Sequence, residues 1–340
     1  MNFAHLHVHS NYSFCRGANT IEQLCATAHQ RGLSHIALTD TNGLYGLVWF
    51  LQSARRYNIQ PIIGAHLQTP KTHGVVLAKN DNGYRFLCQT ISYIHGQDEF
   101  NLQSHLVHNK HDIFLLTDDT DLLLALKHAN RCDDVFAELI PHQRSESVLQ
   151  FARRHDFPVV ASNAVYMIDK SDYATHRILR AIDLNTTLER VPSHELSSPE
   201  ACLHHENDMR TKFPQVPEAL ENSWAIAQQC MTHLDFKQHI FPSFTPTQGQ
   251  DINAYLWNRV REGIKWRYGS SNDNIEKRLQ YEMDIILEKQ FAPYFLVVAD
   301  IVQHAPRTCG RGSAAASLVS YALGITHVDP KNTIYFSNVF

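Results

Sequence analysis

The chain opens on Phe3-Ala4-His5-Leu6-His7-Val8-His9-Ser10, in which three histidines alternate with apolar residues. Successive side chains of a β-strand point to opposite faces, so this stretch predicts a strand with His5, His7 and His9 on one face. A row of imidazoles on a rigid element offers the neutral nitrogen ligands of a metal site. The alternative is that these histidines are polar residues on the wet face of an edge strand, because the sequence is rich in histidine throughout.

Beyond this stretch, short apolar runs alternate with segments of helical periodicity. The further strands are expected at residues 34–38, 60–67, 74–79, 112–117, 135–139 and 158–162, with helices that include 84–94, 121–130 and 145–155. Seven strands separated mostly by helices are typical of an α/β fold, a parallel sheet or (βα) barrel with both faces covered. In such barrels the side chains that do chemistry lie at the C-terminal ends of strands, where His9, Asp40, His66 and Asn163 fall.

The composition limits the class of protein. A length of 340 residues suggests about two domains, and 44% hydrophobic with 19% charged residues is a globular composition. The net charge of -4 excludes a chain held to nucleic acid by bulk positive charge. The seven cysteines contain no C-x-x-C pair, which predicts a reduced, cytoplasmic protein. No signal peptide and no membrane span is evident in the sequence.

The second half of the chain is expected to be mostly helical. Helices are predicted at residues 173–183, 199–212, 218–231, 252–268, 275–289 and 294–304. Residues 236–250 are proline-rich and loop-like, so we expect one domain over residues 1–240 and another over residues 241–340. Lys and Arg nearly balance Asp and Glu over residues 251–311, which indicates a solvated surface rather than a nucleic-acid-binding stripe.

A glycine-rich loop, Cys309-Gly310-Arg311-Gly312-Ser313, leads into a predicted helix. Glycines before a helix let backbone N–H groups approach an anion, and the helix dipole favours negative charge there. Ser313 is expected to cap the helix, and Arg311 offers a forked cation that suits phosphate. The alternative is an ordinary capped helix after a glycine turn. The loop is not a Walker motif, because no Gly-Lys-Ser/Thr follows.

Several quoted stretches carry a family resemblance along nearly the whole chain. They are HLHVHSNYSFCRG (5–17), IALTDTNGLYG (36–46), PIIGAHL (61–67), VVLAKNDNGYRFL (75–87), PVVASNAVY (158–166) and CGRGSAAASLVSYALGITHVDP (309–330). With these stretches the chain resembles the N-terminal part of the bacterial DNA polymerase III alpha subunit. SNYSFCRGA (10–18) and GRGSAAAS (310–317) favour the error-prone relative of that subunit.

The resemblance implies two domains. The first, over residues 1–240, is a polymerase-and-histidinol-phosphatase (PHP) domain, a distorted seven-stranded βα barrel with a helical C-terminal part. The second, over residues 241–340, is a truncated palm segment in which Gly310, Arg311, Gly312 and Ser313 hold a nucleotide triphosphate. Family catalysis uses aspartates that bind two Mg²⁺ ions. The resemblance places these beyond Phe340, so we expect no catalytic residue here and Mg²⁺ only in an assembled enzyme.

The barrel metal site implied by the resemblance is kept only in part. His7 and His9 match the first ligand pair. Four other positions differ: an acidic residue is replaced by Arg16, a histidine by Thr41, a carboxylate by His66, and an Asn-Asp-x-His pattern by Asn163-Ala164-Val165-Tyr166. A polynuclear centre needs carboxylates to balance its charge. The family pattern therefore leaves His7, His9 and His66 for one Zn²⁺ or Mn²⁺, with Asp40 and Asn163 behind them, or else as hydrogen-bonded polar filler.

Two functions remain open on the sequence. The first is a polymerase III alpha-like protein of DNA replication or repair, inactive as a polymerase alone, which acts as part of a split polymerase or as a scaffold. Its expected partners are the remaining polymerase polypeptide or other replication and repair subunits, with DNA and nucleotides bound only in the assembled enzyme and no membrane. The alternative is a metal-dependent phosphoesterase or exonuclease that uses the reduced PHP site.

Overall fold

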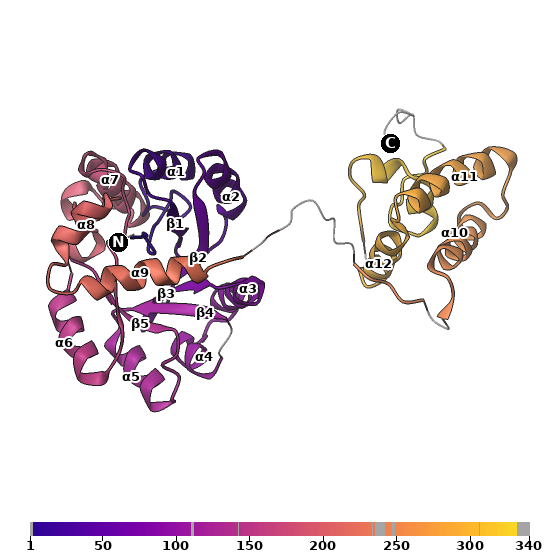
Figure 1. The fold of residues 1–340 in the computed structure, drawn as a ribbon. Helices are drawn as coiled ribbons and strands as arrows, with labels where there is room; N and C mark the ends of the chain where they lie inside the picture. Colours follow the sequence, from indigo (N-terminus) through magenta and orange to yellow (C-terminus); the bar gives the residue numbers. More distant parts are fainter. Residues whose placement is uncertain are drawn as a thin grey trace. The chain divides into compact units, whose positions relative to one another are not determined.

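The computed structural model describes residues 3–109, 112–141, 143–232, 234, 242–246, 249–305 and 307–331. The chain forms two compact units, Met1–Leu234 and Asp235–Phe340 (Figure 1). The expected domain boundary between residues 240 and 241 lies outside the described residues. No helix in the described ranges combines the length and the apolar character needed to cross a bilayer.

Six strands form one curled sheet in the first unit, in the order β1-β2-β3-β4-β5-β6. Their bounds are β1 His35–Leu38, β2 Gln60–Gln68, β3 His73–Ala78, β4 Ile113–Thr117, β5 Val135–Leu139 and β6 Val159–Ala161. Pairing is parallel between β1 and β2, between β4 and β5, and between β5 and β6. The predicted α/β class is therefore confirmed, as a half-barrel whose strands are mainly parallel.

β3 departs from the expected parallel arrangement, because it pairs antiparallel with both β2 and β4. Only four residues connect β2 to β3, and the Thr69 N–H donates to the Thr72 carbonyl oxygen at 2.9 Å within that turn. A parallel crossover needs a dozen or more residues. The short connection therefore fixes β2 and β3 as a hairpin.

The opening stretch does not form the continuous strand expected of it, because the backbone bends at His7. Instead it pairs through two isolated parallel bridges. His5 pairs with Ile36 of β1, and Val8 pairs with Val165, a few residues beyond β6. The stretch thus links the first strand of the sheet to the segment that follows the last one.

Helices lie around this sheet (Figure 1). Their bounds are α1 Ile21–Gln30, α2 Leu47–Arg56, α3 Asp81–Gly96, α4 Leu102–His108, α5 Thr120–His128, α6 Ser145–His155, α7 Tyr173–Asp183, α8 Glu206–Lys212 and α9 Pro217–Gln229. The helix predicted over 199–212 is wrong in its first half. Cys202 there forms an extended bridge with Met167, and this pairing keeps the residues before α8 out of a helix.

Apolar side chains fill most of the first unit. Leu6, Ile62 and Leu116 belong to one fully buried cluster that also contains Ile226 of α9. A larger cluster packs the remaining strand faces against the surrounding helices. Against this apolar background, the buried histidines of the opening stretch stand out as candidates for a function.

The second unit is helical and has its own core. Its helices are α10 Ile252–Tyr268, α11 Asp273–Glu288, α12 Ala292–Gln303 and the short α13 Leu318–Ala322. Leu256, Leu279, Leu296 and Leu318, one from each helix, are all buried in that core. The three long helices agree with the predicted ones to within two residues at each end, because each has a clear apolar face.

Candidate metal centre

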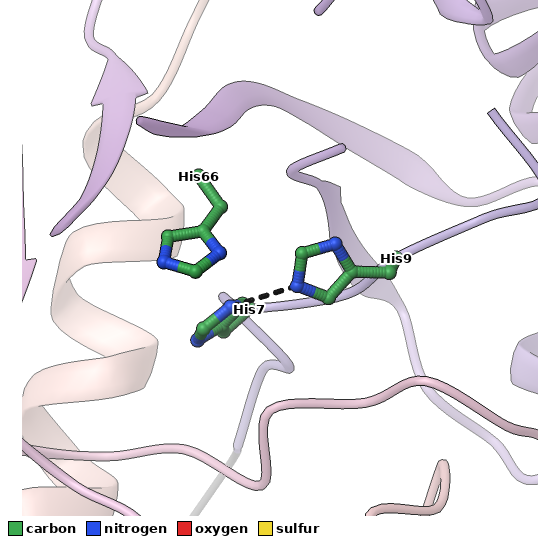
Figure 2. Close-up of side chains that lie close together, drawn as sticks. All are labelled: His7, His9 and His66. Carbon is green, nitrogen blue, oxygen red and sulfur yellow. Dashed lines mark hydrogen bonds between the residues drawn. The ribbon is translucent and has the colours of Figure 1, made fainter. Parts of the chain in front are cut away.

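Three histidines from two segments meet in the first unit. His7 and His9 come from the opening stretch, and His66 lies near the C-terminal end of β2. All three are buried, and one ring nitrogen of each lies within 4.8 Å of the others (Figure 2). His5 does not join them, because its Nε2 bonds the carbonyl oxygen of His204 at 3.0 Å. Because the backbone bends at His7, the His5 ring lies apart from the other three.

His7 is oriented by a carboxylate that the sequence analysis missed. Its Nδ1 lies 2.8 Å from Oε1 of Glu138, and both side chains are buried. Glu138 is the one charged residue in β5, Val-Phe-Ala-Glu-Leu, and a lone carboxylate in a buried strand is the signal that could have identified it. A carboxylate that accepts the Nδ1 proton leaves the Nε2 lone pair free for a ligand.

His9 is oriented through Ser13 and Asp40. The Ser13 hydroxyl donates to Oδ1 of Asp40 at 2.6 Å, so His9 Nδ1 donates to the same hydroxyl oxygen at 2.9 Å. Asp40 also accepts from the backbone N–H and the hydroxyl of Ser10, at 2.7 and 2.8 Å. Burial raises the pKa of Asp40, and these hydrogen bonds oppose the shift. His9 therefore also keeps a lone pair on Nε2.

The Nε2 atoms of His7 and His9 face each other at 3.0 Å, along the dashed line of Figure 2. Since both Nδ1 protons are directed at other acceptors, this contact is closed either by a proton shared between the two Nε2 atoms or by a cation. Two nitrogens bound to one tetrahedral Zn²⁺ lie about 3.3 Å apart, because the Zn–N distance is about 2.0–2.1 Å. The observed separation is close to that spacing.

His66 contributes an orphaned polar atom. Its Nδ1 is buried and has no hydrogen-bond partner. Burial, followed by the charge of His7, lowers the pKa values of His9 and His66 well below 6.5, and the charge of Arg16 adds to both shifts. Both rings are therefore neutral at physiological pH, the form that binds metals. The three histidines fit a single Zn²⁺ whose fourth ligand is water.

The wall next to His9 is aromatic and cationic rather than acidic. The Tyr166 ring stacks on the His9 ring, with centroids 4.2 Å apart and an interplanar angle of 11°. Burial raises the pKa of Tyr166, and a side-chain hydrogen bond from Arg16 opposes the shift. Among the described residues, only His7, His9 and His66 come close enough together to hold an ion.

Asn163, expected behind the ligands, faces elsewhere. Its Nδ2 donates to the carbonyl oxygens of Glu200 and Cys202, at 2.7 and 2.8 Å. It therefore holds the extended segment before α8 in place. Its Oδ1 is buried without a hydrogen-bond partner, as is Oγ1 of Thr41, whose backbone forms a bridge with His66.

The glycine-rich loop of the second unit is arranged differently from the prediction. Gly312, with φ at +65°, precedes a short 3₁₀ turn that begins at Ser313, and α13 begins only at Leu318. The cap predicted at Ser313 is wrong, since Ser317 caps α13 by accepting from the Ser320 N–H at 3.1 Å. The combination of this φ with ψ at -156° is open essentially to glycine alone, which is why a glycine stands at position 312. Arg311 is exposed.

The amides at the start of α13 are already occupied. Glu282 of α11 is buried and accepts from the N–H groups of Leu318 and Val319 at 3.0 and 3.1 Å. It also accepts from the Ser317 hydroxyl at 2.8 Å and from Arg278 Nε at 2.9 Å. The N-terminus of α13 is thus satisfied by a carboxylate of the same unit. Any anion bound near Gly312 has to use the loop itself.

Two family models match the chain. The model of the PHP domain matches residues 5–154, which include all three clustered histidines and Glu138. The model described as "Bacterial DNA polymerase III alpha NTPase domain" matches residues 254–339, which include the glycine-rich loop. The two matches follow the two compact units in order along the sequence.

Similar proteins are found among bacterial polymerase subunits. The chain is 31% identical to the DNA polymerase III subunit alpha of Bacillus subtilis, over 97% of its own length and 32% of the relative. It is 33% identical to the same subunit of Vibrio cholerae, over 96% of its own length and 32% of that relative. The error-prone DNA polymerase of Symbiobacterium thermophilum is 31% identical, over 97% and 35%. The chain thus spans about a third of the length of the curated relatives it matches.

Proposed function

We propose that this chain, which is similar to bacterial DNA polymerase III alpha subunits along nearly its whole length, acts in DNA replication or repair as the N-terminal part of a DNA polymerase. The observation that carries this proposal is the colinear match of both units to that family, with about 30% identity along 96–97% of the chain. Its partners are then the remaining polymerase residues, other replication subunits and DNA, in the cytoplasm.

Within that assembly, we propose that the PHP unit is a structural module that holds a single metal ion. The argument is electrostatic. Oε1 of Glu138 is paired with His7, and both oxygens of Asp40 accept hydrogen bonds from Ser10 and Ser13, so these two carboxylates are already engaged beside the histidines. The positive charge of Arg16 acts on both His9 and His66 and so opposes a second cation near them. His7, His9 and His66 would hold such an ion, and the shared ion would fix the opening stretch against β2.

The second unit contributes the loop of Gly310, Arg311, Gly312 and Ser313, which we propose lies against the triphosphate of the incoming nucleotide. Among residues 1–340, Asp329 is the one carboxylate that follows this loop, and it accepts from the Tyr268 hydroxyl at 2.7 Å. Two-metal nucleotidyl transfer needs carboxylates that hold both ions. A polypeptide of residues 1–340 is therefore expected to need further polymerase residues for catalysis.

Primer extension tests this function. Residues 1–340 are fused to the remaining two thirds of the Bacillus subtilis relative, and the fusion is assayed with a primed template, Mg²⁺ and four nucleotides. We expect extension by the fusion and none by residues 1–340 alone. The relative with its own first third is the control for folding and DNA binding. A folded fusion that binds primed DNA without extending it, or extension by residues 1–340 alone, contradicts the proposal.

A second function, metal-dependent phosphoester hydrolysis, is favoured by one observation, the orphaned Nδ1 of His66 among neutral imidazoles. Zn²⁺ held by three histidines lowers the pKa of a bound water and so supplies a nucleophile. The test is phosphate release from an aryl phosphate and nucleotide release from a single-stranded oligonucleotide, with Zn²⁺ or Mn²⁺ added. Release that disappears in His7→Ala supports hydrolysis. Equal rates in the parent and in His7→Ala rule it out.

A further inference from the structure

Three aromatic side chains on the first unit are largely exposed. Phe14 is 69% exposed, Tyr45 is 55% exposed and Trp49 is 59% exposed. The Phe14 and Tyr45 rings touch, with centroids 5.8 Å apart. Trp49 lies in the first turn of α2, four residues after Tyr45, which belongs to the turn that leads into this helix. We call these three residues the aromatic platform.

The loop that carries Phe14 is held in one conformation. Ser13 N–H and Arg16 N–H donate to the carbonyl oxygens of Ser10 and Ser13, each at 2.9 Å. A Cβ atom on Gly17 would lie 2.0 Å from the Ser10 carbonyl oxygen, so only glycine permits this close approach. Phe14 is therefore exposed on a fixed support. A surface that is already ordered binds its ligand at a lower entropic cost.

The platform adjoins the histidine cluster. Phe14 directly follows Ser13, whose hydroxyl contacts His9 at 2.9 Å. Tyr45 follows Thr41, whose N–H donates to the same Ser13 oxygen at 3.1 Å. Phe14 and Tyr45 are thus attached to two loops that meet at the Ser13 hydroxyl beside His9.

The charges around the platform are complementary to a polyanion. Residues 11–19 and 41–58 contain no Asp or Glu. Arg56 lies seven residues after Trp49 in α2, which is about two turns, or about 10 Å, along the same face of the helix. Arg55 stands in the same relation to Val48. Arg56 forms an exposed ion pair with Glu22, and such pairs contribute little to stability, so a phosphate could replace Glu22 as the partner of Arg56. Arg55 is exposed and has no ion-pair partner among the described residues.

We propose that the aromatic platform binds single-stranded DNA, with bases stacked on Phe14, Tyr45 and Trp49 and phosphates on Arg55 and Arg56. Every base has a π face, so such stacking is tolerant of sequence, and it requires unpaired bases. A protein partner is the other class of occupant. The lack of Asp and Glu in the two segments that carry the three rings favours the nucleic acid over it. This inference rests on the proposed function in DNA metabolism.

The test is fluorescence anisotropy of a fluorescein-labelled 20-nucleotide oligo(dT) titrated with the whole 340-residue chain at low salt. We expect Phe14→Ala, Tyr45→Ala and Trp49→Ala each to weaken binding about 5- to 150-fold, the equivalent of about 1–3 kcal/mol per stacked base. Trp49→Phe keeps a stacking ring and is expected to bind nearly as the parent does. The matched control is Trp266→Ala, an equally exposed tryptophan of the second unit.

Salt and strand form refine the result. Removing one phosphate contact with Arg55→Ala is expected to reduce the slope of log affinity against log salt by about 0.7. A duplex of the same length is expected to bind more weakly than the single strand. If the oligonucleotide does not bind, or binds equally to the parent and to all three platform variants, the inference is wrong and the surface is left to a protein partner. Such a result would leave the proposed function untouched, because primer extension by the fusion tests that function independently.

Discussion

Two buried polar clusters of this chain differ in how completely they are hydrogen-bonded. Around Glu282, both carboxylate oxygens accept two hydrogen bonds each, and the donors all come from the same unit. In the histidine cluster, the His7 and His9 Nε2 atoms face each other and His66 Nδ1 has no partner. A fully satisfied buried cluster supports the fold. A buried cluster with unmatched lone pairs can accept an ion or a water.

The largest effect is expected at Glu282. Glu282→Ala removes the acceptor of four hydrogen bonds and leaves the Leu318 and Val319 amides buried without a partner. A buried amide that loses its partner costs about 1–3 kcal/mol, so we expect the two together to lower the free energy of unfolding by about 2–6 kcal/mol. Urea unfolding measures this change in the free energy of unfolding. The control is Glu288→Ala, at an exposed position on the same helix. A loss below about 1 kcal/mol would mean that the cluster is not structural.

The next effect concerns metal affinity. Glu138→Gln keeps the size of the side chain but weakens the hydrogen bond that fixes His7, and outer partners of this kind contribute about 10- to 100-fold in metal affinity. Competition with a zinc chelator measures the affinity of the parent and the variant. Glu146→Gln, on the surface of α6, is the control. Equal zinc affinity in both, or a parent that takes up no zinc, contradicts the single-ion site.

Substitutions of His66 and His7 distinguish metal binding from stabilisation of the fold within one cluster. His66→Leu removes an unpartnered polar atom, so we expect the metal-free chain to be unchanged or more stable by about 1 kcal/mol, with zinc binding lost. His7→Leu leaves Glu138 buried without its partner and is expected to destabilise by about 1–3 kcal/mol. Chemical unfolding in the presence of a chelator compares the two. A larger loss in His66→Leu than in His7→Leu reverses the assignment.

The six strands of the sheet could be read from the sequence because each is a short apolar run bounded by polar or proline residues. The antiparallel direction of β3 could be derived only from the length of one connection, since the strand pattern is the same in either direction. Residues 199–205 were misjudged because their extended form depends on pairing with Met167, which is distant in sequence. Local pattern predicts elements well and long-range pairing poorly.

The same limit applies to the sites. Alternation and position at a strand end made His7, His9 and His66 candidates, and the family resemblance selected these three as the possible ligands. The pairing of Glu138 with His7 joins residues 131 positions apart, and that of Glu282 with Leu318 joins residues 36 apart. No spacing rule brings either pair together. Sequence therefore identified the residues that end a strand, and the structure was needed to identify those that orient them.

His176 provides the smallest and finest test. It is buried, its Nδ1 donates to the Arg16 carbonyl oxygen at 2.7 Å, and its Nε2 accepts from the Ser197 N–H at 3.0 Å. Both nitrogens are satisfied only in the neutral ring. Burial lowers the pKa of His176 below 6.5, and the bond to the Arg16 carbonyl opposes that shift.

The unfolded chain takes up a proton near pH 6.5, whereas native His176 does so only at lower pH, so the unfolded state binds more protons in between. Its contribution to stability is therefore fully present above pH 6.5 and declines as the pH falls below it. His176→Asn keeps a donor toward Arg16 and cannot titrate. We expect it to reduce the slope of unfolding free energy against pH by no more than about 1.4 kcal/mol per pH unit, the value for one proton. The control is His194→Asn, at an exposed site, which is expected to leave the slope unchanged. An equal slope in the parent and in His176→Asn would contradict the prediction, because it would show that folding does not change the pKa of His176.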